Sequence, residues 1–133
     1  MSDLPDIRVN ELNHVAIAVS DVEKSVEFYH EKLGFPIVGR PAFSFPWAWL
    51  RLGARQGLHL IADEGRAAGE GASREGHFAL YVEDLAAVTR RLKAVQVSFS
   101  GPGPRPDGAQ QLFVVDPDGN VLEFCSNLPL PSG

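Results

Sequence analysis

The chain has 133 residues, of which 44% are hydrophobic, so it can form one compact domain or two small modules that share a core. Its formal charge is −5, from 12 basic and 17 acidic side chains, whereas a protein that binds nucleic acid needs a basic face. We therefore expect no nucleic acid partner. A small molecule or a second copy of the chain is expected instead.

The cysteine content and the N-terminal segment indicate a cytoplasmic protein. Cys125 is the single cysteine, which excludes a disulfide within the chain. Residues 1–14 lack the basic start and the apolar run of a signal peptide. No apolar stretch approaches the roughly 20 residues that span a bilayer, so we expect no membrane partner.

The first half of the sequence predicts a strand, a helix and a hairpin in that order. Apolar residues alternate with others in residues 13–21 (NHVAIAVSD), which is typical of a half-buried strand. A helix is predicted to follow, with Ser20 or Asp21 as its cap and Gly34 as its stop. Residues 47–61 (WAWLRLGARQGLHLI) predict a hairpin with its turn at GARQG.

The second half repeats this order. A strand is predicted from His77 to Val82, followed by a helix with an acidic start at Glu83 or Asp84. Residues 111–125 (QLFVVDPDGNVLEFC) predict a second hairpin with its turn at DPDGN.

The two halves align with each other. Sliding the first half by 63 positions places His14 on His77, and an offset of 64 places His59 on Glu123. Such self-similarity indicates a duplicated unit. We therefore predict an α+β fold of two βαβββ modules in a pseudo-twofold arrangement that forms a curled-sheet cleft. The predicted bounds of the modules are 10–63 and 74–127, with a linker at 64–73.

These four side chains are candidate metal ligands. His14 and His59 belong to the first module, and His77 and Glu123 belong to the second, so packing of the modules about the pseudo-twofold axis would bring them together. Imidazole and carboxylate groups suit Zn, Ni, Fe, Co or Mn. A single histidine in a strand is more often a packed residue, and this alternative stays open for His59.

Three segments in a fixed order carry a family resemblance. They are residues 12–35 (LNHVAIAVSDVEKSVEFYHEKLGF), 76–85 (GHFALYVEDL) and 116–124 (DPDGNVLEF). Over about residues 10–127 the chain resembles the vicinal oxygen chelate superfamily, which includes glyoxalase I, fosfomycin-resistance proteins, extradiol dioxygenases and bleomycin-resistance proteins. The resemblance implies paired βαβββ units around a divalent metal ion that the substrate chelates through two neighbouring oxygens.

The resemblance also implies roles for the four candidates. His14, His77 and Glu123 match the metal ligands that the family shares, and His59 stands where glyoxalase I has a glutamate or glutamine. An imidazole in place of a carboxylate makes the site less anionic by one charge. The resemblance further implies a homodimer, and in some relatives the modules swap between chains, so that one site uses ligands from two chains.

The sequence departs from individual members of the family. Ala16 replaces a threonine of the fosfomycin-resistance pattern, and the basic segment that follows the glutamate in that pattern is missing, so we do not expect that activity. No set of residues matches the groups with which glyoxalase I grips glutathione. Arg40, Arg51 and Arg105 remain candidate contacts for an anion, and the subfamily stays open.

A stripe of aromatic residues precedes and enters the first hairpin. Phe43, Phe45, Trp47 and Trp49 would point the same way in an extended chain. We expect Phe45, Trp47, Trp49 and Arg51 to contact an apolar or aromatic substrate, and burial in a core or a dimer contact is the alternative. The Pro- and Gly-rich segment 100–110 (SGPGPRPDGAQ) is predicted to be a loop, either over the cleft or in solvent.

The predicted function is a divalent-metal-dependent enzyme that acts on a small substrate with adjacent oxygens. A glyoxalase-like lyase or isomerase would remove a proton next to a metal-bound carbonyl, with Glu123 as the candidate general base if it loosens from the metal. Two alternatives stay open. One is a non-haem Fe(II) dioxygenase of the extradiol type with His14, His77 and Glu123 as ligands, and the other is a non-catalytic protein that binds an aromatic drug.

Overall fold

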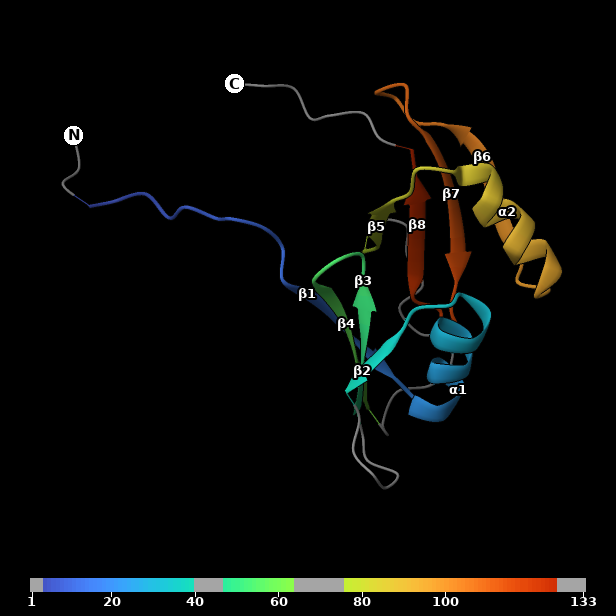
Figure 1. Cartoon of the computed structure of the whole chain (residues 1–133), viewed down its shortest axis with the longest axis horizontal. Helices are drawn as coiled ribbons and strands as arrows, with labels where there is room; N and C mark the ends of the chain where they lie inside the picture. The colour runs from blue at the N-terminus through green and yellow to red at the C-terminus, as the bar shows by residue number, and fades with distance from the viewer. Residues whose placement is uncertain (1–3, 40–46, 64–75, 127–133) are drawn as a thin grey trace.

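Two four-stranded sheets form the framework of the computed structural model, which describes residues 4–39, 47–63 and 76–126 (Figure 1). The first sheet has the strand order β1-β4-β3-β2, and the second has the order β5-β8-β7-β6. In chain order the elements are β1 (His14–Val19), α1 (Val22–Val26), the π-helix η1 (Glu27–Lys32), β2 (Ile37–Gly39), β3 (Trp47–Leu52), β4 (Gln56–Ala62), β5 (Phe78–Tyr81), α2 (Leu85–Ala94), β6 (Phe99–Pro104), β7 (Gln110–Val115) and β8 (Val121–Cys125).

The two sheets follow the same plan. In each sheet the first strand runs parallel to the last, and the remaining pairs are antiparallel. Ala16 pairs with His59 across β1 and β4, and Ala79 pairs with Glu123 across β5 and β8. These pairs are related by the offsets found in the sequence, which confirms the predicted α+β fold of two repeated modules. The predicted linker at 64–73 lies outside the described residues.

Aspartate side chains begin both helical segments, as predicted. Asp21 Oδ1 accepts hydrogen bonds from two backbone N–H groups of the first turn of α1 at 3.0 and 3.3 Å, and Asp84 Oδ1 accepts one from Ala87 at 2.9 Å. The first helix differs from the prediction in its second half, where η1 continues it as a π-helix. This segment buries Phe28 and Tyr29.

The prediction of a loop at residues 100–110 is wrong for its first half, because β6 is an edge strand paired with β7. An edge strand tolerates proline, since one row of its N–H groups needs no partner in the sheet. The pairing shifts register between Ser100 and Gly103. Within this shift Gly101 has a φ of +98°, and a Cβ atom there would lie 2.8 Å from the carbonyl oxygen of Gln111, so glycine is required.

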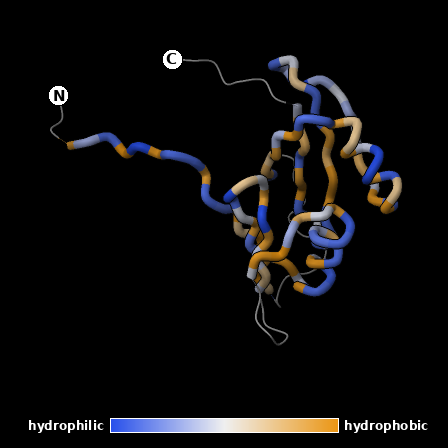
Figure 2. Tube along the Cα trace, viewed as in Figure 1, coloured by the Kyte–Doolittle hydropathy of each residue, from blue (hydrophilic) through white to orange (hydrophobic). Residues whose placement is uncertain are grey.

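One face of the first sheet is packed and the other is open. Leu50, Leu58 and Leu60 are fully buried, whereas the side chains of Trp49 and Ile61 are 44% and 47% exposed. This alternation follows from the twofold period of a strand. Figure 1 shows both helices on one side of the molecule, and in Figure 2 the hydrophobic colour runs along much of β7.

No helix in the described part of the chain has the length and apolar character needed to cross a membrane.

The DPDGN turn at residues 116–120 is a buried hydrogen-bonding centre. Asp116 Oδ1 accepts from the backbone N–H groups of Asp118 and Asn120 at 2.9 and 2.8 Å. Its second oxygen, Oδ2, accepts from the side chain of Asn120 and from the hydroxyl of Tyr29 at 2.8 Å. Tyr29 lies in η1, so Asp116 connects the second module to the first.

Further hydrogen bonds cross between the modules at the same place. Asp118 Oδ1 accepts from the backbone N–H of Ser20 at 3.0 Å, and Asn120 Nδ2 donates to the carbonyl oxygen of Ala18 at 3.2 Å. On α2, Arg91 Nε donates to a carbonyl oxygen at the C-terminal end of η1 at 2.8 Å. The orientation of the two sheets within one chain is therefore set by directional polar contacts as well as by apolar packing.

We predict that Tyr29→Phe lowers the free energy of unfolding by about 1.5–3 kcal/mol at neutral pH, because it removes a buried hydrogen bond to a carboxylate. Urea unfolding measures the change. The matched control is Tyr81→Phe, at a side chain that is half exposed, and it should change stability by less than about 0.5 kcal/mol. Equal effects of the two substitutions would show that the hydrogen bond between Tyr29 and Asp116 does not contribute to the free energy of unfolding.

The same contact predicts a difference at high pH. Burial, followed by the negative charge of Asp116, raises the pKa of Tyr29 well above its ordinary value of 10. A raised pKa means that the folded state favours the protonated phenol, so this stabilisation is complete below pH 10 and is lost as the pH rises through the raised pKa. Wild-type protein should therefore lose more stability above pH 10 than Tyr29→Phe, as measured by unfolding at a series of pH values.

Candidate functional site

The first pair of candidate ligands lies on the open face of the first sheet. His14 begins β1 and His59 lies in the middle of β4, and their rings stack with centroids 4.1 Å apart and planes inclined by 14°. Leu58 and Leu60, on either side of His59, are fully buried on the opposite face. The strand thus uses its flanking leucines for packing and leaves the imidazole on the face away from the core.

Trp49 extends this stack of rings. It pairs with His59 across β3 and β4, and the two rings lie parallel with centroids 4.4 Å apart. Trp47 contacts Trp49 on the same face, with centroids 5.1 Å apart, and Arg51 also lies on this face by strand alternation. Three of the four predicted substrate contacts therefore lie on the same face of the sheet as His59, and the fourth, Phe45, is outside the described residues.

Asn13 and Gly57 lie next to the first pair of candidate ligands. Nothing in the sequence pattern identified either residue. Asn13 Oδ1 lies 2.8 Å from His14 Nδ1, and an amide oxygen accepts, so His14 carries its proton on Nδ1 and leaves Nε2 free to bind a metal ion. A Cβ atom on Gly57 would lie 3.4 Å from His59 Nε2 and 3.5 Å from His14 Cβ. Glycine at this position leaves room above both imidazoles.

A shallow hollow of about 340 Å³ surrounds the first pair. Its lining includes both imidazoles, Trp49, Arg51 and Arg55. Burial of the ring, followed by the neighbouring imidazole of His14, lowers the pKa of His59 below its ordinary value of 6.5. The neutral form that can bind a metal ion is therefore favoured at His59.

The second pair of candidate ligands is His77 with Glu123. His77 immediately precedes β5, and its Nε2 lies 2.9 Å from Oε1 of Glu123 in the middle of β8. The side chain of Glu123 is only 4% exposed, and the ring of Phe113 stands edge-on to that of His77. A carboxylate this deeply buried needs partners, because an unpaired charge in the interior is strongly destabilising.

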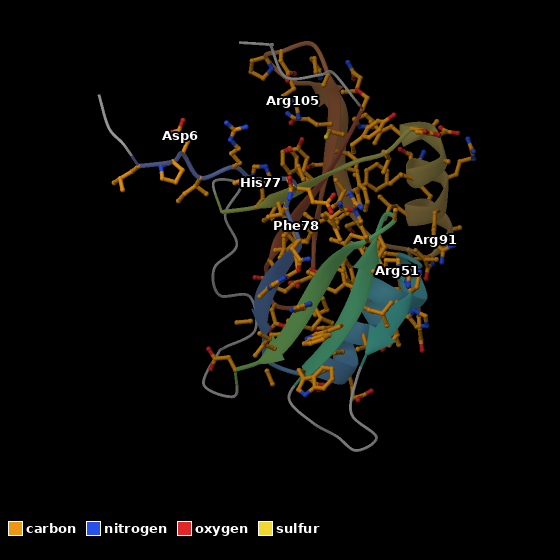
Figure 3. The ribbon with its side chains drawn as sticks, turned by 60° about the vertical axis from the view of Figure 1, so that its left-hand side comes forward. Asp6, Arg51, His77, Phe78, Arg91 and Arg105 are labelled. Carbon is orange, nitrogen blue, oxygen red and sulfur yellow. The ribbon has the colours of Figure 1, made fainter. Side chains whose placement is uncertain are left out.

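Arg105 is the second partner of Glu123, at a distance of 3.2 Å between Arg105 Nη1 and Glu123 Oε2. Figure 3 labels His77 and Arg105 in the same region of the second module, where both reach Glu123. The sequence analysis singled out Arg105 as a candidate anion contact. The structure instead places its guanidinium on a carboxylate of the protein itself.

Asp107 holds Arg105 in place. The carboxylate of Asp107 accepts from Nε and Nη2 of Arg105, at 2.9 and 2.5 Å, and from the backbone N–H of Ala109 at 3.1 Å. Hydrogen bonding to Arg105 lowers the pKa of Asp107 to about 2, so its charge is present throughout the physiological range. The hydrogen bond from Arg105 to Asp107 is in turn the main cause that raises the pKa of the guanidinium.

The four predicted ligands therefore form two pairs within one chain. Among the residues that the structure describes, no group of three or more potential ligand side chains gathers around a common point. The second pair has the spacing of two ligands of one metal ion. The 2.9 Å between His77 Nε2 and Glu123 Oε1 is close to the separation of two adjacent ligands that each lie roughly 2.0–2.2 Å from one ion. Two or three further ligands are needed to complete a site.

Comparison with known proteins supports a single family. Residues 11–124 match the family model described as Glyoxalase/Bleomycin resistance protein/Dioxygenase superfamily. A probable lactoylglutathione lyase of Vibrio cholerae is 30% identical over 128 residues, which cover 90% of this chain and 93% of that protein. The glutathione transferase FosA of Serratia marcescens is 35% identical over 119 residues, which cover 85% and 78% of the two chains.

A solved structure agrees with these relatives. The bleomycin resistance determinant encoded on transposon Tn5 is 27% identical and superposes with a TM-score of 0.74, covering 90% of this chain and all of that one. The match of the family model over most of the sequence, together with the repeated βαβββ sheets, shows that the chain belongs to the Glyoxalase/Bleomycin resistance protein/Dioxygenase superfamily.

Proposed function

We propose that the protein is a metal-dependent enzyme of the glyoxalase type, a lyase or isomerase that removes a proton next to a carbonyl group of a small substrate. The observation that carries the proposal is the position of the two ligand pairs. His59 and Glu123 occupy equivalent positions of β4 and β8. The imidazole of His14 contacts His59, and the imidazole of His77 contacts Glu123. His14, His59, His77 and Glu123 together supply a donor set that suits Zn, Ni, Fe, Co or Mn.

A complete site on this proposal requires two chains. The first pair of one chain would join the second pair of its partner in a homodimer, because the pairs of one chain do not form a common group among the described residues. A symmetric dimer would then contain two identical sites. One metal ion per chain is the expected content.

The N-terminal arm supports association with a second copy. Figure 1 shows residues 4–13 extending away from both sheets, on the side opposite the helices. Leu4, Ile7, Val9 and Leu12 on this arm are 66–93% exposed. Apolar side chains that are exposed together on an extended segment usually mark a contact with another molecule.

Each residue of the site has a task in the proposed reaction. The metal ion, when bound, would polarise the substrate carbonyl and stabilise the enediolate. Glu123 is the proposed general base, because its carboxylate is the only acidic group in the proposed ligand set, and it would accept the proton on Oε1 after that oxygen loosens from the metal ion. Trp47 and Trp49 would pack against an apolar part of the substrate, and Arg51 is placed to contact an anionic group beside them.

A second candidate function is the binding of an aromatic compound without catalysis. The ring of Trp49 is 44% exposed and forms a continuous stack with His59 and His14, which offers a flat apolar surface to a planar ligand. A binding protein of this kind would not need the buried Glu123. The dependence of activity on Glu123 therefore separates the two candidates.

We predict that His59→Ala weakens metal binding at least tenfold with little loss of folding, because it removes a ligand from an open face. Metal content after dialysis against a fixed metal concentration, together with the melting temperature, measures both effects. His30→Ala is the control, because His30 is not one of the proposed ligands and contacts the carbonyl oxygen of Phe35 in the first module. This variant should keep the metal content of the wild type. If His59→Ala retains the full metal content and only lowers the melting temperature, His59 is a packing residue.

Mixed dimers test the two-chain site. One variant carries His14→Ala and His59→Ala, and the other carries His77→Ala and Glu123→Ala, so neither homodimer has a complete site. Refolding an equal mixture creates dimers with one intact site, and we expect metal content to recover to about a quarter of the wild-type value per chain. A site built within one chain would show no recovery.

Substrate turnover tests the proposed reaction class. A panel of hemithioacetals, 2-oxo thioesters, epimerisable thioesters and catechols is offered to protein loaded with Zn, Ni, Co, Mn or Fe(II), the last in the presence of oxygen. We expect turnover of a hemithioacetal or a thioester, and a loss of at least 100-fold in Glu123→Gln, because a general base contributes about that much. Turnover of catechols alone would indicate the dioxygenase reaction, and tight binding without turnover would indicate a binding protein.

A further inference from the structure

Arg105 has a geometry that the proposed reaction does not use. All three kinds of nitrogen in its guanidinium make contacts: Nε and Nη2 bind Asp107, and Nη1 points to Glu123 Oε2. The turn between β6 and β7 is itself closed by two backbone hydrogen bonds, from Arg105 to Ala109 and from Gly108 to Arg105, at 2.7 and 2.8 Å. Asp107 therefore holds the guanidinium on one side, and the Nη1–H group on the other side faces the buried carboxylate of Glu123.

The two oxygens of Glu123 face different partners. Oε1 lies 2.9 Å from His77 Nε2, on the side where the proposed metal ion would be held, and Oε2 lies 3.2 Å from Arg105. A carboxylate can bind a metal ion through one oxygen or through both. Binding through both would require Oε2 to leave Arg105, and the guanidinium would then lose its third contact.

We infer that Arg105 is a positioning residue that limits Glu123 to a single bond with the metal ion and so keeps two adjacent coordination positions open for a substrate that chelates through two oxygens. The inference rests on the proposed four-ligand metal site. Three imidazoles and one carboxylate oxygen occupy four positions of a six-coordinate ion. A second bond from Glu123 would occupy a fifth position and leave room for a single donor atom.

Asp107 supports Arg105 in this positioning role. With its acceptor oxygens on Nε and Nη2, Asp107 fixes the direction of Nη1 and balances the charge of the guanidinium, which is 27% exposed. The net charge that the pair adds near the metal ion is therefore small. Arg105 acts on the site through a hydrogen bond to Glu123, and an arginine without Asp107 would hold Glu123 less firmly.

The experiment compares a two-oxygen probe with a single-donor probe on Co²⁺-loaded dimer. Acetohydroxamate binds through two neighbouring oxygens and azide through one nitrogen, and the visible absorption of Co²⁺ reports the binding of each. In Arg105→Met, which keeps an apolar stem and has no donor, we expect the affinity for acetohydroxamate to fall about tenfold or more, as is usual for loss of a group that orients a ligand. The affinity for azide should change less than about threefold, because one open position remains.

Two further variants and one control sharpen the comparison. Arg105→Lys keeps a positive donor and should recover part of the affinity for acetohydroxamate. Asp107→Asn keeps the guanidinium but weakens its support, and it should give an intermediate loss even if Arg105→Met fails to fold. The control is Arg90→Met, which removes a largely exposed arginine that lies 4.0 Å from the carboxylate of Asp84.

The outcomes separate this inference from the proposed function. If Co²⁺ does not bind the wild-type dimer, the metal site is wrong and the inference is overturned with it. If Co²⁺ binds and the ratio of the two probe affinities is the same in wild type, Arg105→Met and Asp107→Asn, the metal site stands and the role of Arg105 is overturned. A selective loss of acetohydroxamate that Arg105→Lys partly restores supports the inference.

Discussion

The buried carboxylate of Asp116 is the contact on which the arrangement of the two modules depends. Both of its oxygens are satisfied, by the backbone and side chain of its own turn and by the hydroxyl of Tyr29 in the other module. Because hydrogen bonds are directional, this contact fixes how the modules meet in a way that apolar packing alone would not. The position of each pair of candidate ligands, and hence the need for a partner chain in the proposed site, follows from that arrangement.

The period of a β-strand explains how one short segment serves both the core and the site. Leu58 and Leu60 are fully buried, and His59 between them lies on the opposite face against Trp49. The equivalent strand β8 differs, because Glu123 is buried as deeply as its neighbours and has a polar contact with His77 and an ion pair with Arg105. The two halves of the proposed site are thus equivalent in the backbone and different in electrostatics.

Much of the fold could be predicted from the sequence because local patterns and an internal repeat carried it. The offsets that relate His14 to His77 and His59 to Glu123 reappear as strand register. The strand β6 could not be recognised, since Pro102 and Pro104 indicate a loop unless the segment is known to lie at a sheet edge. The resemblance to the glyoxalase and bleomycin-resistance superfamily is confirmed by the family match.

The candidate site was only partly predictable. Spacing and repetition identified the residues on the strands, but they carry no information about contacts between distant segments. Asn13 follows no pattern that marks a partner of His14, and Arg105 was noted for its charge alone, without its contacts to Glu123 and Asp107. The division of the candidate ligands into two pairs depends on how the modules pack, which neither the repeat nor the residue types determine.

The most direct test of the central claim is a crystal structure of the protein loaded with Co²⁺ or Zn²⁺, with the metal located by anomalous scattering. The account predicts one peak per chain, roughly 2.0–2.2 Å from Nε2 of His14 and from a ring nitrogen of His59 in one protomer. In the partner, His77 Nε2 and one oxygen of Glu123 would lie at the same distances, with Arg105 still on the other oxygen. A peak held by one chain alone, or an ion bound without His59 and Glu123, would contradict it.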